Sequence, residues 1–313
     1  MNKYLFLLCI VGYQTIQSCA QGAESYDMHQ QKSVAAIYGK WYSRPLLSIL
    51  TQYKWPSIIA GMFADSQLSS YFIPGFIKKY ALNDSHFLQP VEEFKTFNDF
   101  FRRKLKPEAR PIFPGDNAII SPADGAVLII PVLHQDLSFP IKGITLSLEK
   151  LLQNNNLAEE FKDGTAVIIR LAPWDYHRLH FPVSGIPSKH TIIHGDYQSV
   201  HPYVYRCGIQ PLEINERHVI LYETDQVGKM AIIPVGALFV GSITHTYTPN
   251  HRHNKGDEIG YFSFGGSTVV LLFQKNTIII PDHVMQNSAQ GNETPIKMGA
   301  LLAESTITTG SHN

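Results

Sequence analysis

Ser267 stands where its type and neighbours could support nucleophilic chemistry. It follows Gly265 and Gly266, and apolar, strand-like residues flank the three on both sides. Two glycines permit a tight backbone, so the serine hydroxyl could reach the carbonyl of the preceding peptide bond. A Gly-Gly-Ser run is far more often a plain turn, however, so the motif alone does not separate the two interpretations.

Two histidines, His177 and His180, lie in the run Ala-Pro-Trp-Asp-Tyr-His-Arg-Leu-His-Phe-Pro that begins at Ala172. Residues at this spacing share a face of a helix but lie on opposite faces of a strand, and the two prolines favour a loop. Histidine titrates near neutral pH, so acid–base chemistry is one interpretation. A metal-binding pair or simple hydrogen-bonding histidines fit the pattern equally well.

Asp124 belongs to the run Ser-Pro-Ala-Asp-Gly, which is typical of an ordinary turn. The functional alternative is a carboxylate that orients an imidazole. Asp, His and Ser in this chain order could form a nucleophile triad, because triads are defined by geometry and not by order. His245, His251 and His253 could also bind a metal, but solvated loop histidines are the favoured interpretation, so no metal site is predicted.

Short apolar runs separated by Gly, Pro, Asn and Asp must position these side chains after Pro114. The pattern predicts a compact β-rich domain of mostly antiparallel short strands. The predicted strands are 118–120, 126–132, 166–171, 190–194, 219–223, 230–234, 237–243, 268–273 and 277–280, with a last strand within 295–302 and a short helix at 146–152.

Residues 41–82 are apolar, carry few charges and show helical spacing, interrupted at Pro74-Gly75. This region could pack on the body of the protein or present an apolar face to a membrane surface. A second helix is predicted at 94–106, starting near Thr96 or Asn98. Its basic end could contact lipid phosphates or be solvated, where cations suit the helix dipole. The expected fold class is α+β, with a helical, membrane-associating region at 41–113 and a catalytic domain at 114–313.

The composition and the first residues limit the possible functions and the expected location of the protein. The chain has 313 residues, 44% hydrophobic and with zero formal net charge, so no basic surface indicates nucleic-acid binding. Residues 1–21 have the order of a secretory signal peptide, and a polar linker is expected at 22–40. A buried first helix and a lipoprotein signal ending at Cys19 are alternatives. We therefore expect an extracytoplasmic, peripherally membrane-associated protein, with soluble secretion as a variant. Cys207 alone cannot form an internal disulfide.

Several motifs together resemble the phosphatidylserine decarboxylase family over roughly residues 45–300. Three carry most of the resemblance: the runs around Asp124, around His177 and His180, and Lys-Gly-Asp-Glu-Ile-Gly-Tyr-Phe-Ser-Phe-Gly-Gly-Ser-Thr-Val, which ends just after Ser267. The further motifs are Phe97-Asn98-Asp99-Phe100-Phe101 with Arg103, Ile141-Lys142-Gly143, Asn215-Glu216-Arg217, and Val235-Gly236-Ala237 leading to Val240-Gly241-Ser242-Ile243. The family usually has Asn where this chain has His201, a difference expected to affect substrate contacts at most.

The resemblance implies a precursor that cleaves itself between Gly266 and Ser267. His180, oriented by Asp124, would take the Ser267 proton, and Ser267 would become a covalent pyruvoyl cofactor at the start of an α chain (267–313) that stays with the β chain. The pyruvoyl group would form a Schiff base with phosphatidylserine in membranes, release CO2 and yield phosphatidylethanolamine, with His177 as proton donor. No external cofactor or metal is implied, and a homodimer is an open possibility.

Two other classes of protein use the same residue types. A serine hydrolase would contain this Ser, His and Asp, but the sequence has no Gly-x-Ser-x-Gly elbow. A lipid-binding protein without enzymatic activity would explain the apolar region at 41–82. Both alternatives predict a chain that stays intact, so cleavage at Ser267 separates them from the decarboxylase.

Overall fold

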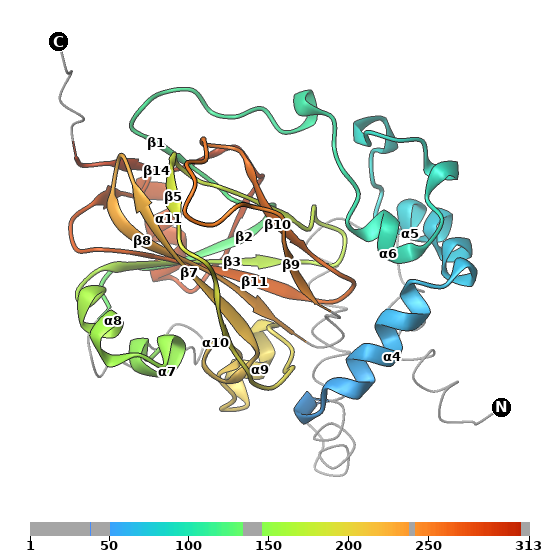
Figure 1. Cartoon of the computed structure of the whole chain (residues 1–313), viewed down its shortest axis with the longest axis horizontal. Coiled ribbons are helices and arrows are strands. Elements are labelled where there is room, and N and C mark those ends of the chain that lie inside the picture. Colours follow the sequence, from blue (N-terminus) through green and yellow to red (C-terminus); the bar gives the residue numbers. More distant parts are fainter. Residues whose placement is uncertain (1–37, 39–50, 134–145, 238–241, 308–313) are drawn as a thin grey trace.

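The computed structural model in Figure 1 describes residue 38 and residues 51–133, 146–237 and 242–307. The predicted signal peptide and nearly all of the predicted linker lie outside the described residues. So do residues 41–50, the Ile141-Lys142-Gly143 motif and Val240-Gly241. The division into a helical region at 41–113 and a catalytic domain at 114–313 stays a prediction.

An eight-stranded sheet forms the centre of the molecule. Its order is β13 (Thr294–Ile296), β2 (Gly125–Ile130), β3 (Thr165–Leu171), β11 (Ser267–Phe273), β8 (Gly228–Gly236), β7 (Arg217–Thr224) and β5 (Gly185–Pro187), and β6 (Thr191–Ile193) also pairs with β7. Two three-stranded sheets accompany it, with the orders β4 (Arg178–His180), β10 (Glu258–Phe262), β9 (Ile243–His245) and β1 (Ala118–Ile120), β14 (Leu301–Ser305), β12 (Ile278–Ile279). Every pairing between named strands is antiparallel, which confirms the predicted α+β class and β-rich domain.

The strand β11 is buried along its whole length because both faces of the large sheet are covered. Val269 and Leu271 belong to one apolar core, and Val270 and Leu272 to a second core that includes α7 (Leu148–Leu152) and part of α8 (Asn155–Glu160). Side chains alternate along a strand, so Ser267 shares the face of Val269. Its hydroxyl therefore points into the core that contains residues of β4 and β10.

Most predicted strands are confirmed, with ends shifted by at most two residues. The predicted strand at 237–243 falls mainly on residues 238–241, outside the described part, and β9 begins only at Ile243. Three strands, β4, β5 and β10, were not predicted. The prediction of one strand at 295–302 was wrong: a turn at Gly299 separates β13 from β14. Gly299 has φ +86°, and a Cβ there would lie 2.5 Å from the carbonyl oxygen of Pro111.

The helices α4 (Lys54–Ala64), η2 (Gln67–Phe72), α5 (Ile73–Lys79) and α6 (Phe97–Phe101) lie to one side of the sheets, drawn in blue to blue-green in Figure 1. An aromatic cluster joins α5 to α6: the Phe76 ring lies 5.2 Å from that of Phe97 and 5.8 Å from that of Phe100. Pro74-Gly75 does not interrupt this region as predicted. It lies in the first turn of α5, where a missing proline N–H leaves no hydrogen bond unmade.

The predicted helix at 94–106 is much shorter in the structure. The Thr96 hydroxyl accepts the backbone N–H of Asp99 (3.0 Å) and caps α6, which confirms Thr96 as the start. The helix ends at Phe101 because Arg103 turns inward: it is 4% exposed and donates from Nη2 to the carbonyl oxygens of Trp174 (3.0 Å) and Asp175 (3.2 Å). Arg103 is thus neither a lipid contact nor a solvated helix end.

The remaining elements are α9 (Pro202–Arg206), α10 (Pro211–Ile214), α11 (Asp282–Ala289) and the single turns η3 (Asp84–His86), η4 (Val91–Glu93) and η5 (Pro107–Ala109). Among the described residues, no helix has the length and apolar character needed to cross a membrane. Cys207 follows α9 as an exposed free thiol.

Candidate active site

Ser267 is the first residue of β11 and is fully buried. It pairs with Leu171 of β3 on one side and with Gly236 of β8 on the other. The three strands are apolar and continuous, so Ser267 stands at the start of a rigid strand in the centre of the sheet. A reactive group at this position is held more precisely than one on a mobile loop.

His177 is the direct hydrogen-bond partner of Ser267. Its Nδ1 lies 3.2 Å from the Ser267 hydroxyl oxygen, and its Nε2 lies 3.0 Å from the carbonyl oxygen of Ala172. A carbonyl only accepts, so Nε2 carries the proton in the neutral ring and Nδ1 offers a lone pair. The lone pair faces Ser267, whose hydroxyl donates to it.

The surroundings of His177 oppose a positive charge on its ring. The ring is completely buried and stacks on Phe101 of α6, with centroids 3.9 Å apart. Burial and then the nearby Arg103 guanidinium lower the pKa of His177 to about 3. At neutral pH this imidazole is therefore neutral and well placed to hold the serine hydroxyl, but it is a weak proton acceptor.

His180 has different partners. Its Nδ1 donates to the carbonyl oxygen of Gly256 (2.8 Å), which leaves Nε2 to accept the Tyr176 hydroxyl (3.2 Å). Burial lowers the pKa of His180, while the negative charges of Glu258 and Asp124 act in the opposite direction. Within the described residues His180 makes no hydrogen bond to Ser267.

Asp124 lies in the predicted turn, between β1 and β2. Its carboxylate accepts from Nε of Arg110 (2.7 Å), from Nη2 of Arg110, from Nζ of Lys297 (3.3 Å) and from the backbone N–H of Met298 (2.9 Å). Burial opposes ionisation, but Arg110 and Lys297 outweigh it, so the pKa of Asp124 lies below its ordinary value. Asp124 is a carboxylate held between two cations.

The structure brings the four predicted residues into one region without assembling the predicted triad. Ser267 contacts His177 and not His180, and in the described structure Asp124 makes no hydrogen bond to either histidine. The turn of Asp124 does adjoin His180, whose backbone N–H donates to the carbonyl oxygen of Pro122 (2.9 Å). The roles that the resemblance implies for Asp124, His177 and His180 stay predictions.

Motif residues to which the sequence analysis gave no role hold the segment before Ser267. The Asn98 side chain of α6 accepts the backbone N–H of Phe264 (2.8 Å), and the Phe264 ring packs edge-on against Phe101 (5.5 Å). The next residue, Gly265, has φ +143°, a conformation that favours glycine. Asn98 and Phe101 stand in a motif that carries the resemblance, so the motif was a signal for them. Arg110 and Lys297 had no such signal.

His201, at the position where the family usually has Asn, has a local structural role. Its Nδ1 accepts the backbone N–H of Tyr203 (3.2 Å) at the start of α9. Asparagine is among the preferred residues at this N-cap position, because its side-chain oxygen accepts the same kind of N–H. Either residue can therefore begin α9, and the adjacent Val200 would lie only 3.9 Å from a Cβ at Gly266.

The three loop histidines considered for a metal do not meet. Nδ1 of His251 lies 3.0 Å from the carbonyl oxygen of Pro249, and Nε2 of His253 lies 3.0 Å from that of Thr248. Both rings donate to backbone of their own loop, while His245 packs against other histidines.

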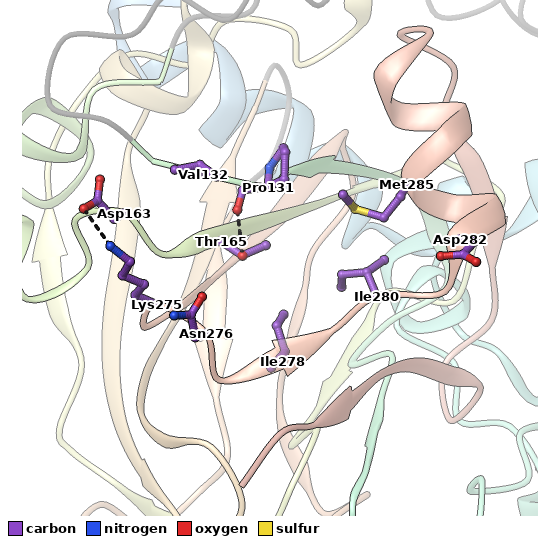
Figure 2. Close-up of a pocket in the computed structure, with 10 residues that line it drawn as sticks. All are labelled: Pro131, Val132, Asp163, Thr165, Lys275, Asn276, Ile278, Ile280, Asp282 and Met285. Atoms are coloured by element: carbon purple, nitrogen blue, oxygen red, sulfur yellow. Dashed lines mark hydrogen bonds and ion pairs between the residues drawn. The ribbon is translucent and has the colours of Figure 1, made fainter.

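A hollow of about 510 Å³ lies away from these residues (Figure 2). Thr165 and the Asp163–Lys275 ion pair (3.4 Å) line it. Thr165 begins β3 and pairs with Phe273, whereas Ser267 pairs with Leu171 at the other end of the same two strands. The hollow is therefore separate from the candidate active site.

Comparison with known proteins agrees with this site. The family model described as phosphatidylserine decarboxylase matches residues 97–304, which include all four predicted site residues. A phosphatidylserine decarboxylase proenzyme of Chlamydia muridarum is 42% identical over 261 residues, 83% of this chain and 87% of that relative. Relatives of the same name from Chlamydia trachomatis serovar L2 (38% over 286 residues; 90% and 95%) and Ruminiclostridium cellulolyticum (38% over 290 residues; 92% and 97%) match as well. The chain belongs to the phosphatidylserine decarboxylase family.

Proposed function

We propose that this chain is a precursor that cleaves its own Gly266–Ser267 bond and then acts as a carboxy-lyase. It converts phosphatidylserine to phosphatidylethanolamine and CO2 in phospholipid biosynthesis. The observation that carries the proposal is the buried Ser267 hydroxyl, 3.2 Å from Nδ1 of His177 and directly after two glycines. Family membership supports phosphatidylserine as the substrate. The name proenzyme given to the relatives supports cleavage of a precursor.

Cleavage begins when the Ser267 oxygen attacks the Gly266 carbonyl carbon and its proton passes to a histidine. The nitrogen of Ser267 leaves that carbon, so the amide becomes an ester. Loss of the Ser267 α-proton expels the Gly266 carboxylate and leaves dehydroalanine. Addition of one water then releases ammonia and leaves a pyruvoyl group at residue 267. The β chain ends at Gly266 and the α chain begins at residue 267.

The surroundings of Ser267 fit a small keto group. The side chain is fully enclosed, and His177 offers a nitrogen at hydrogen-bond distance. A Cβ at Gly266 would approach Ala237 and Val200 no closer than 3.8 Å, so the cleavage site has room for small rearrangements. Once formed, the pyruvoyl group supplies a ketone that reacts with the substrate amine and an electron sink for the loss of CO2.

The two histidines divide the proton transfers in our proposal. His177 orients the hydroxyl, but a ring with a pKa of about 3 is a poor base. His180 lies near the negative charges of Glu258 and Asp124, which favour its protonated form. We assign the base of cleavage to His180, which must exchange the Tyr176 hydroxyl for Ser267, since catalytic hydrogen bonds often form only in the reacting state. After cleavage, His177 adjoins residue 267; its Nδ1, unprotonated at rest, takes up one solvent proton in each turnover and gives that proton to the carbon that has lost CO2.

The two chains should stay together after cleavage because β11 is hydrogen-bonded on both sides to β-chain strands. All seven of its residues pair with β3 and with β8. Farther along the α chain, β13 pairs with β2 and β14 pairs with β1. The cut falls at the start of β11 and removes only the nitrogen of residue 267, so the pairings of residues 268–273 do not have to break.

Intact-mass analysis of the purified protein tests the proposal. We expect two chains, with the α chain beginning as a pyruvoyl group at residue 267, and one uncut chain in Ser267→Ala. Ser263→Ala is the matched control: it removes a buried hydroxyl from the same segment, hydrogen-bonded to Ser242 (3.1 Å), and should still cleave. A single uncut wild-type chain would reject the proposal.

An apolar surface on α4 and η2 supports docking to the membrane that holds the lipid. Its most exposed members are Trp55 (50%), Met62 (68%), Leu68 (67%) and Tyr71 (81%). The face has no acidic residue between Lys54 and Ala64, and Lys78 of α5 is exposed nearby. Exposed aromatic and aliphatic side chains beside a basic residue are typical of a helix that lies in a membrane interface. We propose peripheral membrane association through this face.

Co-sedimentation with phosphatidylserine-containing vesicles tests the docking surface. The double variant Met62→Asp, Leu68→Asp should bind vesicles at least tenfold more weakly but retain activity on a short-chain soluble phosphatidylserine. Ile192→Asp, on a β6 residue that is 44% exposed, is the control and should change neither. Equal loss of vesicle binding and of soluble activity in the double variant would count against a docking role.

A further inference from the structure

Three histidines from separate parts of the chain meet beside the large sheet. His218 lies in β7, His245 ends β9, and His190 lies between β5 and β6. One ring nitrogen of each lies within 4.8 Å of the other two. The closest contact joins Nδ1 of His218 and Nε2 of His245, 2.7 Å apart, and the His190 ring centroid lies 4.1 Å from that of His245.

The contacts within the group leave one ring nitrogen of His245 without a partner among the described residues. One hydrogen bond between His218 and His245 accounts for a single proton. Nδ1 of His245 is buried and has no hydrogen-bond partner among the described residues. Buried polar nitrogens are normally satisfied, so the His245 ring has donor or acceptor capacity that the described contacts do not use.

The group is distinct from the candidate active site. His245 pairs through its backbone with Gly260 of β10, so the two sites share a sheet. Within the described residues, no hydrogen bond joins His190, His218 or His245 to Asp124, His177, His180 or Ser267. The metal-site inference is therefore independent of the proposed function.

We propose that His190, His218 and His245 bind a divalent transition-metal ion, with Zn²⁺ as the best fit. Three neutral imidazoles plus one water complete a tetrahedral zinc site. The group contains no carboxylate, and Lys189 stands beside His190, so Ca²⁺ and Mg²⁺, which require oxygen ligands, are disfavoured. His190 and His245 are partly exposed, which gives the ion a path from solvent.

Binding requires a small movement of the rings. Two nitrogens on one tetrahedral zinc, each about 2.0–2.1 Å from the metal, lie about 3.4 Å apart. The nitrogens of His218 and His245 must therefore separate from 2.7 Å as the ion replaces their shared proton. The ion would connect β7 of the large sheet to β9 of the three-stranded sheet and to the segment before β6. Its effect should be to stabilise the fold.

Titration of metal-free purified protein with Zn²⁺, against a chromogenic chelator, tests the site. We expect one tightly bound ion per chain in the wild type and at least tenfold weaker binding in His190→Ala. Co²⁺ in the same site should give the intense visible absorption of tetrahedral coordination. His251→Ala is the matched control, an exposed histidine outside the group, and should bind as the wild type does.

Thermal unfolding of the same proteins distinguishes a loss of zinc binding from a loss of the fold. Zn²⁺ should raise the Tm of the wild type and of His251→Ala but leave that of folded His190→Ala unchanged. Should His190→Ala not fold, His245→Gln replaces it with the same expected loss. No bound ion in the wild type, or binding that survives in His190→Ala and is lost in His251→Ala, would overturn the proposal.

Discussion

Two groups of histidines in this molecule differ in burial and in the partners of their rings: His177 and His180 are buried, whereas His190 and His245 are partly exposed. At Ser267, the nitrogens of His177 and His180 have carbonyl or hydroxyl partners that fix which nitrogen carries the proton. Around His245, the rings face one another, and one buried nitrogen has no partner in the described structure. Burial, with neighbouring His190 and His218, also lowers the pKa of His245 to about 3.

The contrast shows how the partners of an imidazole determine what it can do. A carbonyl on one nitrogen locks the tautomer and directs the other lone pair at a chosen atom, which suits proton transfer. Several neutral rings whose nitrogens converge can offer their lone pairs to one metal ion. The following predictions test both halves of this contrast.

The largest expected effect concerns the two histidines at Ser267. His180→Ala should slow self-cleavage by roughly 10²–10⁴-fold, the usual contribution of a positioned general base. His177→Ala should slow cleavage less but abolish decarboxylation in the molecules that do cleave, because the proton donor beside residue 267 is gone. The measurements are the cleaved fraction with time, by intact mass, and CO2 release per cleaved chain.

Ser263→Ala is the control for both variants, because it alters the same segment without touching either ring. If His180→Ala cleaves at the wild-type rate while His177→Ala does not cleave, the base is His177, and the division of roles proposed above is wrong. The contact geometry of the uncleaved chain would then be the better guide than basicity.

Arg103 links α6 to the segment that carries His177, so substituting it tests what holds that histidine in place. Arg103→Met keeps an apolar stem against Phe100 but removes the hydrogen bonds to Trp174 and Asp175. Hydrogen bonds from charged groups contribute roughly 1.5–3 kcal/mol each, so the free energy of unfolding should fall by several kcal/mol. Denaturant unfolding in a Ser267→Ala background measures it without heterogeneous cleavage.

The matched variant Arg103→Lys keeps the positive charge but loses the planar guanidinium. It should be destabilised less than Arg103→Met, and only Arg103→Met should raise the pKa of His177, because only that variant removes the nearby cation. Histidine NMR titration reads this pKa. Equal stability of Arg103→Met and the wild type would show that the buried guanidinium is not what fixes this segment.

Acid should destabilise the uncleaved chain in part through His177. Its pKa is about 3 in the folded chain and about 6.5 when unfolded, so the unfolded state takes up the proton first. The stability contributed by the neutral ring is complete above about pH 6.5 and is lost as pH falls toward 3, by about 1.4 kcal/mol per pH unit. Unfolding of Ser267→Ala with and without His177→Gln should show a shallower pH slope in the double variant. Identical slopes would mean that His177 is not held neutral.

The central sheet was predictable because its strands are continuous apolar runs. Strand β11 and its neighbours β3 and β8 are buried on both faces, so burial left a plain signal in their composition. Strands β4 and β10 are short, and their pairing register shifts between Glu258 and Gly260, so periodicity did not reveal them. The end of α6 depends on carbonyls of Trp174 and Asp175, far along the chain, which no local pattern reports.

The same reasoning explains the outcome for the histidines. His177 and His180 were found because they lie close together in a specific motif. His251 and His253 drew attention to a metal for the same reason, yet their rings bond to their own loop. His190 and His218 gave no local signal, since only the pairing of distant strands brings them to His245. Sequence proximity identified chemistry within a motif and missed chemistry assembled by topology.

The smallest expected effect is on the free energy of unfolding, where a substitution in the histidine group at His245 should cost less than one in the active site. Without metal, His190→Ala should change the free energy of unfolding by no more than about 0.5 kcal/mol, because a partly exposed ring that forms no ion pair within the described residues contributes little. His177→Ala, at a fully buried ring stacked on Phe101, should cost several times more. Both are measured by denaturant unfolding of the Ser267→Ala chain with a chelator present. A large cost for His190→Ala under these conditions would mean that the three rings stabilise one another by packing alone, without a metal ion.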